Sequence, residues 1–155
     1  MQWIPDHFSP LMFLTFLLTL TAVVGIVEAA MVAVRRKRFA RLARQWEMHY
    51  HAYDVLGLAP RLAGSMPRPG AADVCVRDLL FSRVGETLLY ILTVEYTVGL
   101  IHSKRRRFQA AASRDPVQSN PASPLILTFA PEEMPLLEQY EYLRVLENRI
   151  VAPDA

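Results

Sequence analysis

The 155-residue sequence has few of the residues that build disulfide frameworks and phosphate-binding loops. Its single cysteine, Cys75, excludes a disulfide within the chain and a zinc site made of several cysteines. It has only six glycines, and none of them belongs to a GxGxxG fingerprint, a Walker A loop or a GxSxG nucleophile elbow. We therefore expect a protein that performs no catalysis and uses no cofactor.

Charged residues of either sign are absent from positions 8–27. A helix of this length is about 30 Å long, which matches the hydrocarbon thickness of a bilayer. No Lys or Arg precedes the apolar run, whereas a cleaved signal peptide begins with positive charge. The sequence therefore predicts an N-terminal tail and an uncleaved transmembrane helix within residues 1–34.

Positive charge is concentrated directly after this span. Six basic residues lie between Arg35 and Arg44, and none lies before Phe8. The positive-inside rule then places the N-terminus outside and the remainder of the chain in the cytoplasm. We expect a single-pass protein of the cytoplasmic (inner) membrane, and one unpaired cysteine agrees with a reducing compartment.

A second apolar segment, residues 84–102, raises the question of a second span. Glu95 would lie near the bilayer centre, at a cost of about 2.5–3.5 kcal/mol. The basic run that begins at Lys104 would then lie on the wrong side of the membrane. Apolar residues also alternate along the segment and many are β-branched or aromatic, which favours a strand. A strand is therefore predicted, with a second or re-entrant membrane segment or a soluble helix as the alternatives.

The remaining pattern predicts an α+β fold with a small antiparallel sheet of about four strands. A central hairpin spans 73–98, a third strand 105–114 points Phe108 inward, and a short fourth strand covers 125–129. A helix is predicted over 35–53, because its apolar residues recur every three or four positions, and a short helical turn over 60–63. The expected segments after residue 34 are a basic juxtamembrane helix (35–54), a Pro/Gly-rich connector (55–72), the sheet (73–130) and an acidic C-terminal helix with its tail (131–155).

The C-terminal helix is predicted over 135–151 from its two-sided pattern. Its apolar side is expected to carry Leu136, Tyr140, Leu143, Leu146 and Ile150. Its outer side is expected to carry Glu138, Glu141, Arg144 and Glu147.

The order of segments is similar to that of a known class of proteins. The span is followed by RRKRFARLARQW, a Pro/Gly-rich break and then VRDLLF…YILTVEYTVG…KRRR. Over roughly residues 10–130 the chain resembles single-pass bacterial membrane proteins that carry a small cytoplasmic α+β domain of unknown function. The resemblance implies the same hairpin followed by a basic strand. It implies no activity, since the quoted residues are structural types and not catalytic motifs.

Four polar side chains are candidates for chemistry, namely His49, His51, Cys75 and Glu95. On a helix, His49 and His51 point about 200° apart and cannot share a metal ion, so no metal site is expected. Cys75 is expected to be a buried structural thiol, because no partner base accompanies it. Glu95 either faces solvent with its strand face or pairs with Arg105 or Arg107 across the sheet.

Two basic runs give the strongest functional signal, because the charge is segregated along the chain. Residues 35–130 have a net charge of +8 and residues 131–155 have −4. Lipid headgroups, an acidic face of a partner protein or the chain's own C-terminal helix would neutralise the basic runs. No motif for nucleic-acid binding accompanies them. The residues predicted to bind an anion or lipid are Arg35, Arg36, Lys37, Arg38, Lys104, Arg105, Arg106 and Arg107.

Two functions fit these features. The first is a membrane-anchored accessory or scaffolding protein that presents its cytoplasmic domain to a larger membrane assembly, with membrane lipids and another protein as its partners. The alternative is a membrane-attached sensor or binding domain for an anionic ligand or lipid headgroup.

Overall fold

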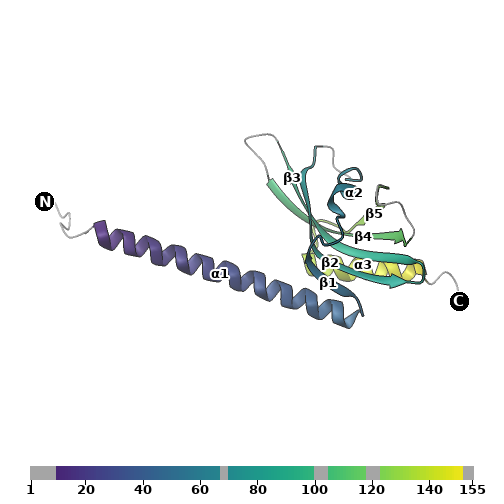
Figure 1. Cartoon of the computed structure of the whole chain (residues 1–155), viewed down its shortest axis with the longest axis horizontal. Helices are drawn as coiled ribbons and strands as arrows, with labels where there is room; N and C mark the ends of the chain where they lie inside the picture. Colours follow the sequence, from purple (N-terminus) through teal and green to yellow (C-terminus); the bar gives the residue numbers. More distant parts are fainter. Residues whose placement is uncertain (1–9, 67–69, 100–104, 118–122, 152–155) are drawn as a thin grey trace. The chain divides into compact units, whose positions relative to one another are not determined.

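The fold of this chain is given by a computed structural model that describes residues 10–66, 70–99, 105–117 and 123–151 (Figure 1). The chain divides into two compact units, Met1–Arg38 and Phe39–Ala155. The α+β class predicted from the sequence is confirmed. The elements are, in order, α1 (Pro10–Gln45), β1 (His49–Tyr53), α2 (Ala59–Ala63), β2 (Ala72–Val84), β3 (Thr87–Val98), β4 (Arg105–Pro116), β5 (Leu127–Phe129) and α3 (Leu136–Val151).

The first 25 residues of α1 carry almost no charge, because Glu28 is the only ionisable residue between Pro10 and Val34. An 18-residue stretch of this helix has a mean hydropathy of 2.3, and none of it is buried. The hydroxyls of Thr15, Thr19 and Thr21 donate to carbonyls three or four residues earlier, at 2.8–2.9 Å. In the part of the chain that is described, α1 alone is long and apolar enough to cross a membrane, which is compatible with a single-pass protein.

The helix predicted over 35–53 is too long, since α1 ends at Gln45 and residues 49–53 form β1. The amide of Met48 donates to the carbonyl of Ala43 at 2.8 Å, and Glu47 has a positive φ of 56°, so the chain reverses here. The aromatic spacing of HYHAY fits both a helix and a strand. Pairing with β2 decides between them, because β1 satisfies backbone groups along the edge that β2 would otherwise expose.

The five strands form one sheet in the order β1-β2-β3-β4-β5, with every neighbouring pair antiparallel. The predicted hairpin is confirmed: Val84 pairs with Thr87, and Gly85 takes the positive φ of 62° that the tight turn requires. The sheet has one strand more than predicted, because β1 was expected to be helical. Both edge strands are short, which limits the backbone exposed at each edge.

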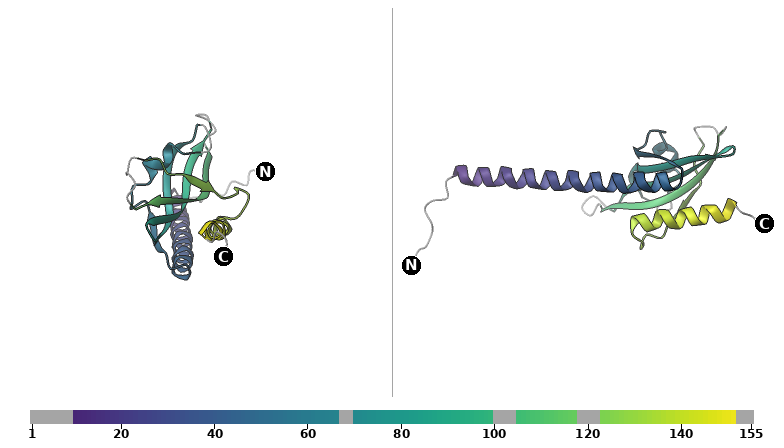
Figure 2. Two further views of the ribbon diagram at one scale, coloured as in Figure 1. Left: turned by 90° about the vertical axis from the view of Figure 1, so that its right-hand side faces the viewer. Right: turned by 90° about the horizontal axis from the view of Figure 1, so that it is seen from below.

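Helices cover both faces of the sheet (Figure 2). Leu89 and Ile91 of β3 pack on one side with α3 and the last turns of α1, which contribute Phe39, Leu42 and Ala43. The alternate residues of β3 pack on the other side with Leu58 and Leu62. These alternate residues are Tyr90, Leu92, Val94 and Tyr96.

Tyr140 fixes α3 on the sheet. Its hydroxyl donates to the carbonyl of Asp78 at 2.7 Å and lies 2.8 Å from the hydroxyl of Thr93. Its ring lies 4.8 Å from the ring of Phe39, measured between centroids. The neighbouring Gln139 accepts a hydrogen bond from the amide of Ala110 at 2.7 Å. One turn of α3 therefore contacts β2, β3, β4 and the end of α1.

The predicted C-terminal helix is confirmed, but one of its outer residues is wrongly assigned. Glu147 is 4% exposed and forms an ion pair with Arg114 of β4. The side chain of Arg114 also donates to the backbone carbonyl of Glu147 at 2.7 Å. The acidic charge of α3 thus neutralises Arg114, which was not among the predicted anion-binding residues.

Replacing Tyr140 with phenylalanine is expected to destabilise the domain by about 1–3 kcal/mol, because Asp78 and Thr93 lose a buried partner. Thermal and denaturant unfolding of the full chain in detergent would measure this. Tyr142→Phe is the matched control, since Tyr142 lies on the same helix and is 42% exposed. Equal stability of the two variants would contradict the central role of Tyr140.

Candidate binding surface

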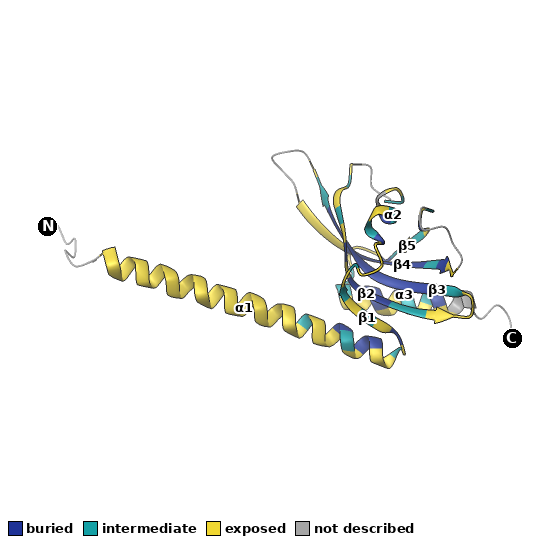
Figure 3. Cartoon of the chain, viewed as in Figure 1, coloured by how far each residue is buried: buried dark blue, intermediate teal, exposed yellow. Residues whose placement is uncertain are grey.

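The basic run at the start of β4 is divided between the two faces of the sheet. Arg106 pairs in register with Thr97 and so shares a face with Glu95, whereas Arg105 and Arg107 point to the opposite face. All three are exposed, as Figure 3 shows for the first part of β4. Lys104 lies outside the described residues. The three arginines are consecutive in the sequence, but the alternation of the strand places their charges on two different faces of the sheet.

The other predicted basic run belongs to a helix. Arg35, Arg36, Lys37 and Arg38 lie in α1, within the unit Met1–Arg38, and the last three of them are exposed.

Glu95 is the centre of the charge arrangement on this face. Its side chain is 7% exposed and forms ion pairs with Arg77 of β2 and with Arg106 of β4, the latter at 3.3 Å. The prediction that Glu95 pairs with Arg105 or Arg107 is therefore wrong, although a cross-strand pair does form. A register shift in β2 between Arg77 and Leu80 places Arg77 on the same face of the sheet as Glu95. The sequence pattern did not indicate this shift.

Cys75, Glu95 and Phe108 form one row across three strands, because Glu95 is the register partner of both other residues. Cys75 is exposed and Phe108 is 43% exposed, so the predictions of a buried thiol and an inward-pointing Phe108 are both wrong. The packing of α3 reaches the preceding row, at Thr93 and Ala110. In this row Cys75 and Phe108 are exposed on either side of the buried Glu95.

We name this region the arginine surface and define it by its five residues. They are Cys75, Arg77, Glu95, Arg106 and Phe108. The side chains of its two arginines are 46% and 71% exposed, although both bind a buried carboxylate. A guanidinium has five N–H donors, so each arginine retains donors for a carboxylate or phosphate beyond its contact with Glu95.

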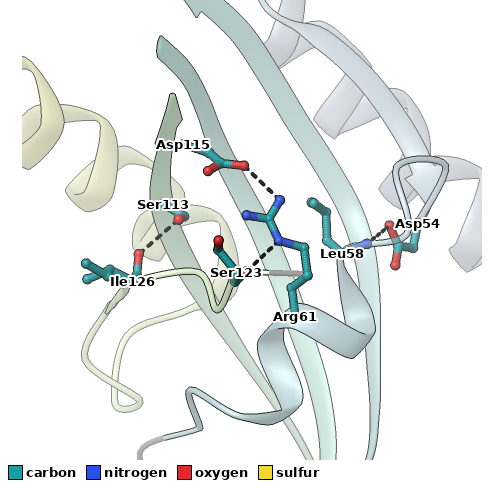
Figure 4. Close-up of polar contacts among 7 residues, drawn as sticks. All are labelled: Asp54, Leu58, Arg61, Ser113, Asp115, Ser123 and Ile126. Carbon is teal, nitrogen blue, oxygen red and sulfur yellow. Dashed lines mark hydrogen bonds and ion pairs between the residues drawn. The ribbon is translucent and has the colours of Figure 1, made fainter. Parts of the chain in front are cut away.

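A second group of charges lies on the opposite face of the sheet, between α2 and β4 (Figure 4). Nη1 of Arg61 lies 2.7 Å from Oδ2 of Asp115, and its Nε donates to the carbonyl of Ser123 at 2.8 Å. The side chains of Arg61 and Asp115 are 12% and 9% exposed. Asp54 caps α2 by accepting the amide protons of Leu58 and Ala59, at 2.8 and 2.7 Å. This group holds α2 and residue 123 against the sheet.

Tyr90 lies beside this ion pair and is 4% exposed. Burial raises the pKa of its phenol above the usual value of 10.0, and the negative charge of Asp115 raises it further, while Arg61 opposes the shift. Tyr90 therefore stays neutral in the folded domain, and the pair Arg61–Asp115 carries no net charge.

His49 and His51 were expected to diverge on a helix, but both lie on β1 and share one face of the strand. Their ring centroids lie 5.3 and 5.8 Å from that of Phe81, so both rings contact the same side chain of β2. Among the described residues, no three His, Cys, Asp or Glu side chains gather closely enough to hold a metal ion.

Comparison with known proteins gives no further guidance. No family model, no curated protein and no solved structure matches this chain. Its function is therefore inferred from the arrangement of its own residues.

Replacing Arg61 with methionine is expected to destabilise the domain by about 3–5 kcal/mol, because the buried Asp115 loses its partner. The double variant R61M/D115L should be more stable than R61M, since it leaves no buried charge. Denaturant midpoints measure both. Arg41→Met, at an exposed position of α1, is the control and should change stability by less than about 0.5 kcal/mol. Similar losses in R61M and R41M would contradict a structural role of the pair.

Tyr90 should make stability fall at alkaline pH. The unfolded chain ionises this phenol at about pH 10, whereas the folded domain holds its proton to higher pH, so folding loses free energy as the pH rises above 10. Tyr90→Phe removes this contribution and should flatten the loss between pH 9 and 11. Denaturant midpoints across this range test it, with Tyr142→Phe as the control that keeps the wild-type slope.

Proposed function

We propose that this protein is a membrane-anchored accessory protein that presents a small cytoplasmic domain to a larger membrane assembly and performs no chemistry itself. One observation carries the proposal. α1 is a single helix from Pro10 to Gln45, and its last turns supply Phe39, Leu42 and Ala43 to the core of the domain. The same element therefore contributes to the apolar unit and to the core of the domain.

The position of positive charge supports the proposed orientation. Arg35, Arg36, Lys37 and Arg38 follow the apolar part of α1 directly, and the positive-inside rule then favours an outside N-terminus and a domain on the cytoplasmic side of the inner membrane. At this position the same residues would lie near the lipid headgroups. Each basic side chain gains about 1 kcal/mol from anionic lipid there, so membrane lipids are the first proposed partner.

The arginine surface supports a protein as the second partner. Arginine and aromatic residues are enriched at the centres of protein interfaces, and they contribute most of the binding energy where they are buried by a partner. Phe108 and the two arginines combine these types on one exposed part of a sheet face.

The alternative function, a sensor for an anionic ligand or lipid headgroup, is favoured by the exposed guanidinium groups of Arg77 and Arg106. The carboxylate of Glu95 lies between these two arginines and binds both of them. A small anion would have to compete with this buried carboxylate. We therefore favour the accessory role.

The single cysteine permits a direct test of the accessory role. Cys75 lies on the arginine surface, so a photocrosslinker attached to this thiol should link the full-length protein in its native membranes to one membrane-protein partner in stoichiometric amount. Mass spectrometry of the linked product identifies the partner.

The control places the crosslinker at the opposite end of the hairpin. The variant C75S/E86C carries its thiol at the exposed turn between β2 and β3, and it should not link the same partner. The accessory role fails if no protein is linked from Cys75, or if both positions link the same set of abundant proteins.

A further inference from the structure

We propose that the partner binds the arginine surface through an acidic segment, whose carboxylates contact Arg77 and Arg106 and whose apolar side chain packs on Phe108. This inference rests on the proposed accessory function, and it adds the chemistry of the partner and the residues that recognise it.

The three recognition residues come from two strands that lie on either side of β3. Arg77 belongs to β2, and Arg106 and Phe108 belong to β4. Glu95 of β3 joins them, because it binds both arginines and is the register partner of Phe108. A segment lying across these strands would contact all three residues at once.

The arginines are held in place before a partner arrives. A free arginine side chain loses about 0.5–1.5 kcal/mol of conformational freedom when an interface immobilises it. Here the buried carboxylate of Glu95 already fixes Arg77 and Arg106, while their side chains remain 46% and 71% exposed. Part of the cost of ordering them is thus met during folding, which favours binding at this surface over binding at an unrestrained surface arginine.

The chemistry of the surface selects an acidic partner. A guanidinium donates hydrogen bonds and accepts none, and its fork matches a carboxylate in a bidentate geometry. The carboxylate of Asp73 also lies on this face, where it accepts a hydrogen bond from Thr97 at 3.0 Å, so Glu95 and Asp73 together balance Arg77 and Arg106. Arg105 and Arg107 lie at the same end of β4, and within a screening length of about 10 Å they leave the field there positive.

Phe108 favours a peptide over a free anion. Its side chain is 43% exposed on the same face as Arg106, two residues away along the strand. An inorganic anion or a headgroup phosphate has no apolar part to cover this ring. A peptide that alternates acidic and apolar side chains satisfies both requirements.

The test uses the full-length protein in nanodiscs of zwitterionic lipid, so that no anionic lipid competes. The probe is a fluorescein-labelled peptide of alternating Glu and Leu residues, and the readout is fluorescence anisotropy at low salt. Wild-type protein should bind this peptide at least tenfold more tightly than the same peptide with Gln in place of Glu. Arg77→Ala and Arg106→Ala should each weaken binding at least fivefold, and each leaves Glu95 one arginine partner.

Two further variants separate recognition from general charge. Phe108→Ala leaves the net charge unchanged and should weaken binding at least threefold. Arg83→Ala removes an equal charge at the hairpin turn, outside the arginine surface, and should leave the affinity unchanged. Melting temperatures close to that of wild type show that a weakened variant is still folded.

The proposal is overturned if the peptide does not bind at concentrations up to about 1 mM, or if R83A weakens binding as much as R77A. It is also overturned if F108A binds like wild type, or if vesicles of anionic lipid or a single-stranded oligonucleotide bind the arginine surface and the peptide does not. If crosslinking from Cys75 identifies a partner while the peptide test fails, the accessory role stands and only the acidic chemistry is wrong.

Discussion

The phenol of Tyr140 joins the parts of the domain that are farthest apart in the sequence. Its hydroxyl contacts β2 through the carbonyl of Asp78 and β3 through Thr93, and its ring packs on Phe39 near the end of α1. α3 is thereby fixed over the centre of one sheet face, together with the last turns of α1. Where this covering ends, the sheet face is open, so the position of Tyr140 also determines which residues of β2, β3 and β4 can meet a partner.

Three buried carboxylates of the domain each bind arginine, and they differ in how far the arginine is covered. Arg61, the partner of Asp115, is 12% exposed, and Arg114, the partner of Glu147, is 32% exposed. The partners of Glu95 are 46% and 71% exposed. A carboxylate whose arginine is also buried mainly joins structural elements. Glu95 instead holds two arginines at the surface, and this difference identifies the arginine surface as the candidate for binding.

The sequence predicts the hairpin, the order of elements and the C-terminal helix, because period-two and period-3.6 patterns are local. It fails at residues 49–53, where HYHAY satisfies both patterns and only pairing with β2 decides. It also fails for Phe108, Cys75 and Glu147. For Phe108 and Cys75 the exposure depends on how far α3 extends over the strands, and for Glu147 it depends on the contact of α3 with Arg114 of β4. Arg77 was missed for a different reason, since its contact with Glu95 is set by a register shift in β2.

The way α1 ends has a consequence for how the domain can be separated from its apolar helix. Phe39, Leu42 and Ala43 are 3%, 7% and 1% exposed, and all three belong to the core beneath α3. A chain shortened to begin after Arg44 would therefore lack part of that core and expose the ring of Tyr140, which packs on Phe39. A chain that begins at Arg35 retains these residues and omits the apolar stretch. Folding of the domain and attachment to the apolar helix thus share the same short segment, because Phe39, Leu42 and Ala43 belong both to α1 and to the core.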